Sequence, residues 1–183
     1  MMQMKNTLYV NLFGSPGAGK SSGAAYVFAK LKMMNIDCEY VQEYAKDKVW
    51  EQNDFIFSKP ENQFYIGAKQ FYRLNRLNGR VSIVITDSPL YLNALYNHSD
   101  LLGNEYTVVL KRLASSFNNL NFFIKRVKPY NPNGRIQTEE QANAIEQNLQ
   151  NQLKEFNCQI VNGDDDGYET IFQTVKKHHI SDI

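Results

Sequence analysis

Residues 8–21 read LYVNLFGSPGAGKS, and this stretch constrains the fold more than any other part of the chain. An apolar run typical of a buried strand leads into a glycine-rich turn, and helix-compatible residues follow. The turn matches G-x-x-x-x-G-K-[ST] at every fixed position, which is the pattern of the phosphate-binding P-loop. The sequence therefore predicts a strand, a tight anion-binding turn and a helix in direct succession.

Each residue type in this turn has a physical role. Glycines let the backbone curl so that successive N–H groups point inward and form a nest for an anion. The helix that begins at Lys20 directs its positive dipole end at the same point. Lys20 is expected to reach the β- and γ-phosphates of ATP, and the Ser21 hydroxyl is expected to hold Mg²⁺. A glycine turn without a ligand is the alternative. The predicted nucleotide-binding residues are Gly14, Ser15, Pro16, Gly17, Ala18, Gly19, Lys20, Ser21 and Ser22.

Length, composition and charge limit the kinds of protein that this chain can be. The 183 residues form one domain of ordinary size, 1–183, and the net charge of +1 favours neither nucleic acid nor a membrane as partner. Cys38 and Cys158 form no metal or redox pattern, which favours a reduced, cytoplasmic setting. No apolar stretch approaches membrane-spanning length. A homodimer is compatible with this composition.

Strand-like and helix-like segments alternate along the whole chain, without repeats or a linker. This alternation predicts an α/β, three-layer P-loop NTPase fold, with a parallel five-stranded sheet and helices on both faces. Strands are expected at 8–13, 37–42, 81–86, 120–124 and 158–161. Helices are expected at 21–34, 44–50, 60–77, 91–96, 104–117, 138–156 and 168–177, with Thr138 as a cap and a turn over 162–167.

Two carboxylates follow predicted strands, and ligands in such folds bind beyond the carboxyl ends of the strands. Asp87 stands where a Walker-B-type acid would hold the water shell of Mg²⁺, together with Ser21. The alternative is a cap of the next helix, because Asp-Ser-Pro is also a cap sequence. Glu43 is placed to accept the proton of an attacking hydroxyl. The alternative is that Glu43 is a solvated residue at the start of a helix.

A basic, proline-containing segment over about 125–140 follows the fourth predicted strand. Arg126 and Arg135 flank its centre, and we predict that the segment is a lid over the triphosphate site. Arginines in a lid neutralise charge on the phosphoryl group in transfer and help to exclude water. An exposed basic loop is the alternative.

The third predicted helix mixes amide and aromatic side chains. Gln70 has the chemistry to hydrogen-bond a planar base, while a neighbouring aromatic ring stacks on it. A helix that simply buries its aromatic residues in the core is the alternative.

With these residues placed, the chain resembles the small P-loop kinases over nearly its whole length. The chain resembles nicotinamide ribosyl kinases and deoxynucleoside kinases at three places, which are EYAKD at 43–47, Gln70 and Thr86-Asp87. In these kinases a glutamate after strand two is the base and a Trp follows it, as Trp50 does here. The resemblance implies that Glu43, Tyr44 and Gln70 contact the acceptor.

Two further stretches carry the same resemblance. Residues 70–76, QFYRLNR, come close to the base-contacting Gln-x-x-x-Leu-x-Arg helix, and an arginine-bearing lid leads into Glu-Glu at 139–140. Compact members of this AAA-labelled, kinase-like group are often phage-encoded, which would place the chain in a host cytoplasm. Two departures stand out. Asp87-Ser88-Pro89 stands where deoxynucleoside kinases carry an acid-Arg-Ser triplet. The P-loop sequence differs from that of the ribosyl kinases.

The resemblance and the residues together imply an ATP- and Mg²⁺-dependent kinase. Its acceptor is a small nucleoside, nucleotide or related base-ribose compound, and Lys20, Glu43, Asp87, Arg126 and Arg135 are the expected catalytic residues. Two alternatives stay open. In the first, the acceptor is a modified base in DNA, which the net charge does not favour. In the second, the chain is an ATPase switch regulated by a protein partner.

Overall fold

The computed structural model describes residues 6–133 and 137–181. Its sheet has five parallel strands in the order β2-β3-β1-β4-β5. The strands are β1 (Leu8–Phe13), β2 (Cys38–Val41), β3 (Ile83–Thr86), β4 (Asn118–Lys125) and β5 (Gln159–Asn162). The helices are α1 (Lys20–Met33), α2 (Tyr44–Trp50), α3 (Asp54–Phe57), α4 (Gln63–Asn75), α5 (Leu90–Leu95), α6 (Gly103–Ser115), α7 (Glu139–Gln152) and α8 (Asp165–Ser181), with short 3₁₀ turns η1 (Pro60–Asn62) and η2 (Leu153–Phe156).

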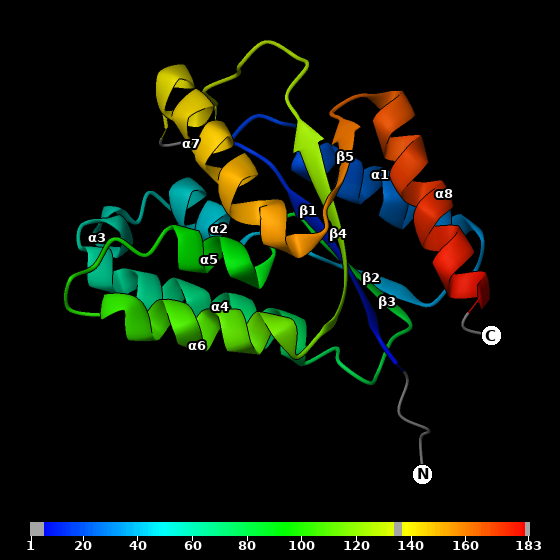
Figure 1. Cartoon of the computed structure of the whole chain (residues 1–183), viewed down its shortest axis with the longest axis horizontal. Helices are drawn as coiled ribbons and strands as arrows, with labels where there is room; N and C mark the ends of the chain where they lie inside the picture. The colour runs from blue at the N-terminus through cyan, green and yellow to red at the C-terminus, as the bar shows by residue number, and fades with distance from the viewer. Residues whose placement is uncertain (1–5, 134–136, 182–183) are drawn as a thin grey trace.

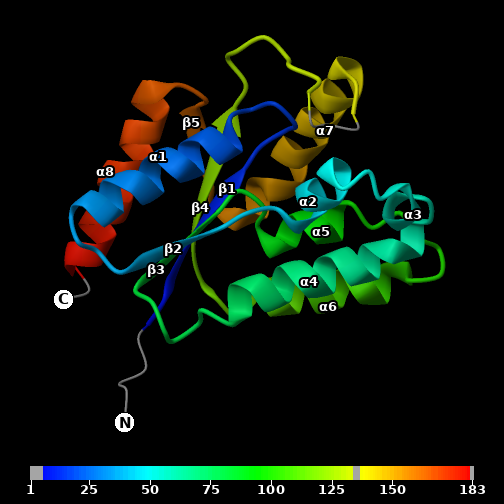
Figure 2. The same cartoon turned by 180° about the vertical axis from the view of Figure 1, so that it is seen from behind.

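The sheet is the middle of three layers, as the sequence predicts (Figure 1). Helices α1 and α8 cover one face, and α4, α5, α6 and α7 lie on the other side, as the reverse view in Figure 2 also shows. Each face has its own apolar core, one containing Val27 and Ile171 and the other Leu74 and Leu110. All six residues of β1 are buried, which is typical of a central parallel strand. Within the described residues, no helix is both long and apolar enough to cross a membrane.

The start of α8 differs from the prediction. The triplet of aspartates was expected to lie in a turn that continues to Gly167, but α8 already begins at Asp165. The Asp164 carboxylate accepts a hydrogen bond of 2.9 Å from the Gly167 N–H, which caps the helix. Asp165 and Asp166 then occupy the first turn, where the helix dipole favours negative charge. The acidic run is therefore a helix start.

The cap predicted at Thr138 is confirmed. Its hydroxyl accepts from the Gln141 N–H at 3.3 Å, and the Gln141 side chain accepts from the Thr138 N–H at 2.9 Å. This reciprocal pair is a capping box, so it fixes the point where the chain between β4 and α7 becomes helical.

We expect Thr138→Ala to lower the free energy of unfolding by about 1 kcal/mol, because the substitution leaves one helix-end N–H without its acceptor. Urea denaturation followed by circular dichroism measures the change. Thr170→Ala is the control, because Thr170 is exposed inside α8, where alanine is the better helix former. An equal loss in both variants would contradict the capping role.

Candidate active site

The P-loop connects β1 to α1 in a conformation that suits its glycines. Gly17 and Gly19 have φ of 85° and 97°, in the left-handed region that favours glycine. At Gly19 a Cβ atom would also lie 2.3 Å from the Tyr168 hydroxyl, so no other residue fits there without a rearrangement. The Lys20 ammonium donates to the carbonyl oxygens of Gly14 and Ser15, at 2.8 and 3.0 Å. The loop thus holds its own cation in place.

Asp87 and Ser21 come together as the sequence predicts for a metal-binding pair. The Ser21 hydroxyl donates to Asp87 Oδ2 at 2.5 Å, although the two residues lie on different elements. The same carboxylate accepts from the Tyr40 hydroxyl at 2.8 Å and from the Glu43 N–H at 3.1 Å. Asp87 is only 3 % exposed, so three donors fix a buried carboxylate beside the P-loop. Pro89 is the residue that caps α5, so Asp87 is not its cap.

Glu43 lies at the end of β2, where α2 begins. Its side chain makes no cap hydrogen bond and lines the same cavity as Lys20 and Asp87. Burial raises the pKa of the Glu43 carboxyl, and the Asp87 charge raises it further, whereas Lys20 acts in the opposite direction. A carboxyl with a raised pKa beside a lysine is suited to accept a proton near neutral pH.

The cavity has a volume of about 450 Å³, in the range of small-molecule sites. It runs from the P-loop past Glu43 to a part between α2, α4 and α5. This part combines apolar walls with amide side chains, and Asn133 and Gln137 of the predicted lid also line the cavity. The lining residues away from the P-loop are Ala45, Val49, Phe57, Gln63, Ile66, Gln70, Leu92, Asn93 and Tyr96.

The predicted lid lies against the P-loop. A Cβ atom on Gly17 would lie 3.1 Å from the Tyr130 ring, so the two segments are in close contact. The Arg126 guanidinium pairs with Glu139 at 3.2 Å, contacts Asn143, and is 5.4 Å from the Tyr130 ring centre. Arg126 is thus at the base of the lid, held by α7. Arg135, the second predicted lid arginine, lies outside the described residues.

One polar contact between the P-loop and α7 was not predicted. The Ser15 hydroxyl, which is fully buried, donates to the Glu146 carboxylate at 2.7 Å. Ser15 was expected only as a phosphate ligand, and no local pattern marks Glu146, because 131 positions separate the two residues. The contact links the P-loop to the helix that follows the segment predicted as a lid.

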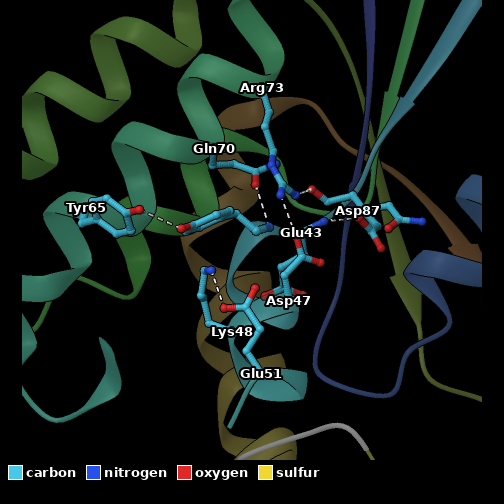
Figure 3. Close-up of polar contacts among 10 residues, drawn as sticks. Glu43, Asp47, Lys48, Glu51, Tyr65, Gln70, Arg73 and Asp87 are labelled. Carbon is cyan, nitrogen blue, oxygen red and sulfur yellow. Dashed lines mark hydrogen bonds and ion pairs between the residues drawn. The ribbon is translucent and has the colours of Figure 1, made fainter. Parts of the chain in front are cut away.

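Gln70 and Tyr44 are placed differently from each other. Gln70, which Figure 3 labels, lies on α4. Gln70 lines the cavity, but its amide accepts from the Tyr44 N–H and donates to the Ser88 carbonyl, both at 3.0 Å. The Tyr44 ring is outside this cavity. Its hydroxyl donates to Tyr65 at 3.0 Å, and the Arg73 guanidinium lies 4.8 Å from the ring centre. Successive helical residues point about 100° apart, so Tyr44 faces away from the cavity that its neighbours line.

Among the solved structures that resemble this chain are a NadR protein and two kinases. A NadR protein in complex with NR has a TM-score of 0.71 at 18 % identity, over 94 % of this chain and 51 % of that chain. Deoxyadenosine kinase from M. mycoides, with the products dCMP and dCDP, has a TM-score of 0.60 at 18 % identity, over 94 % and 99 %. Thymidylate kinase from Ehrlichia chaffeensis has a TM-score of 0.57 at 12 % identity, over 94 % and 98 %. The chain therefore spans about half the length of the NadR protein.

These likenesses concern the fold, and they confirm the predicted three-layer α/β fold with a parallel five-stranded sheet. No curated protein matches the sequence itself. The family described as AAA domain matches residues 9–170, from the second residue of β1 to the second turn of α8. The match covers the P-loop, both carboxylates and the lid, and the chain therefore belongs to the AAA domain family.

Proposed function

We propose that this protein is a phosphotransferase that moves the γ-phosphoryl group of ATP to a nucleoside, nucleotide or related base-ribose compound. One observation carries the proposal. The cavity that Lys20, Glu43 and Asp87 line continues beyond the P-loop along apolar and amide side chains of α2, α4 and α5. A protein that only hydrolyses a nucleotide has no need of this extension.

The residues at the P-loop suit a nucleotide with Mg²⁺. Mg²⁺ in such sites is held by one or two protein side chains together with substrate phosphates and water, and Ser21 and Asp87 would be those side chains. When bound, the ion neutralises negative charge that develops on the phosphate oxygens. The P-loop backbone from Gly14 to Ser22 would bind the phosphates themselves.

The other proposed roles concern positioning and charge. Glu43 orients the acceptor hydroxyl and accepts its proton, as its raised pKa supports. Lys20, Arg126 and Arg135 would stabilise the transferred phosphoryl group. A hydroxyl suits Glu43 better than an anionic phosphate does, because a carboxylate repels a second anion. Nucleosides are thus the preferred acceptors within the class.

Acceptor-dependent consumption of ATP tests the proposal. The purified protein would be incubated with ATP and Mg²⁺ and with single nucleosides, nucleotides, nicotinamide riboside or hydroxymethylated DNA. We expect ATP consumption to rise strongly with at least one small nucleoside-like compound. Slow hydrolysis that responds to a protein partner, and to none of these acceptors, would contradict the proposal and favour a switch.

We expect Asp87→Asn to raise the Mg²⁺ concentration needed for half-maximal activity by about tenfold or more, because the variant keeps the side-chain volume but loses the charge. Titration of Mg²⁺ at saturating ATP measures this shift. Glu51→Gln is the control, because Glu51 is an exposed carboxylate paired with Lys48 at the far end of α2. An unchanged Mg²⁺ requirement in Asp87→Asn would remove Asp87 from the metal site.

A further inference from the structure

Two amide side chains meet in the wall of the cavity. Gln63 is the first residue of α4, and Asn93 lies on α5. The Gln63 amide donates to Asn93 Oδ1 at 3.1 Å, and both residues line the cavity. Asn93 is only 5 % exposed. The Tyr106 hydroxyl donates to the Gln63 carbonyl at 3.0 Å, which holds the start of α4 in place.

The pair leaves one donor group and one acceptor group available. Each side-chain amide has an NH₂ group and a carbonyl oxygen, and one bond between the two amides uses one of each. The Gln63 oxygen and the Asn93 NH₂ group have no hydrogen bond to another described residue. If both amides were turned over, the remaining groups would again be one oxygen and one NH₂ group. The available chemistry is therefore the same for either assignment.

The surroundings select the kind of ligand that fits this pair. Lys20 and Lys46 are the cations among the described residues that line the cavity, and the charge of each acts on Glu43. Gln70 has its amide engaged by backbone groups, as described above. A ligand beside the amide pair therefore meets apolar walls and the two side-chain amides. Apolar side chains here are Ala45, Val49, Phe57, Ile66, Leu92 and Tyr96.

We infer that Gln63 and Asn93 together recognise the base of the acceptor, through a planar edge on which a carbonyl group and an N–H group are adjacent. A carboxamide and the amide edge of a pyrimidine both present this edge. Two further hydrogen bonds would form between the pair and such a ring, and a ring without polar groups would leave both side chains unsatisfied. The inference rests on the proposed function, because it names the acceptor class of the same cavity.

Binding measured without ATP tests this inference separately from catalysis. The probes are nicotinamide riboside, uridine and phenyl riboside, which has no polar group on its ring. Isothermal titration calorimetry gives the dissociation constants. We expect at least one of the two amide-bearing ribosides to bind about tenfold or more tightly than phenyl riboside. Equal binding of all three, or binding of none, would overturn the inference.

Two variants test whether Gln63 and Asn93 cause the preference for amide-bearing ribosides. Gln63→Met keeps the length of the side chain and removes its amide, and we expect the tenfold preference to fall to near unity while phenyl riboside binds as before. Gln63→Met with Asn93→Leu removes both partners, so it leaves no buried amide unpaired and guards against misfolding of the single variant. Gln150→Met, at an exposed position of α7, is the matched control. A preference that survives in a folded double variant would overturn the inference.

Phosphoryl transfer to the same three ribosides tests the proposed kinase activity separately from base recognition by Gln63 and Asn93. Selective binding without transfer would contradict the proposed kinase activity and leave the recognition by Gln63 and Asn93 standing. Transfer with equal efficiency to all three ribosides would contradict the recognition and leave the kinase activity standing.

Discussion

Replacement of Lys20 by alanine is expected to lower kcat/KM for phosphoryl transfer by about a thousandfold or more. The ammonium group lies at the mouth of the P-loop, bonded to the Gly14 and Ser15 carbonyls, where a triphosphate would be bound. Removal of one preorganised charge from a phosphoryl-transfer site costs at least as much as the loss of an oxyanion-hole donor, about a hundredfold to a thousandfold. Steady-state kinetics with the best acceptor of the panel measure the loss.

The fold is expected to survive this substitution. The lysine side chain donates hydrogen bonds to loop carbonyls and lines a cavity, outside the two apolar cores, so we expect the thermal unfolding midpoint to change little. Lys32→Ala is the matched control, because Lys32 lies near the other end of α1 in an exposed pair with Glu39. It should leave both transfer and stability near the wild-type values. Near-normal transfer by a folded Lys20→Ala variant would refute the assignment of the P-loop lysine.

Glu43→Gln is expected to lower kcat by about a hundredfold to ten-thousandfold, because the amide cannot accept a proton from the attacking hydroxyl. Wild-type kcat should rise with pH as Glu43 ionises, and its pKa is raised above the ordinary carboxyl value by burial and by Asp87. The variant should lose this acidic limb. A pH profile of kcat measures both effects, and an acidic limb that remains in the variant would assign the base to another residue.

The same substitution is expected to stabilise the protein near neutral pH. A raised pKa means that the folded protein holds the Glu43 proton more tightly than the unfolded chain does. Stability from this group is therefore present below the unfolded pKa and is lost as the pH rises through the folded pKa. Glu43→Gln should unfold at a higher temperature than wild type at pH 7, and the difference should shrink at low pH. Glu39→Gln, on the strand β2 that precedes Glu43, is the control and should show neither the stabilisation nor its pH dependence.

Much of the fold could be predicted because its signals are local. Strands β1 and β3 are short, largely apolar runs, and the P-loop specifies the turn between β1 and α1 residue by residue. Asp87 and Glu43 could be predicted as neighbours, because parallel strands end at the same edge of a sheet. The start of α8 had a local signal as well, because Asp164 is a good cap residue, but the acidic run was interpreted as a turn.

Contacts between distant elements could not be predicted in this way. The Ser15–Glu146 bond and the Tyr40–Asp87 bond depend on how α7 and β2 are placed relative to the P-loop. The Gln63–Asn93 pair depends on the packing of α4 against α5, and neither residue belongs to a motif. Gln70 had the right chemistry for a base contact, but the structure shows that backbone groups of two other segments engage its amide.

The order of the strands also bears on which parts of the site can open independently. The P-loop follows β1, which is paired on both sides, whereas Glu43 follows β2, which is at an edge and pairs only with β3. Local unfolding is easiest where the fewest neighbours must separate. We therefore expect the segment around Glu43 to open locally at a lower free-energy cost than the P-loop.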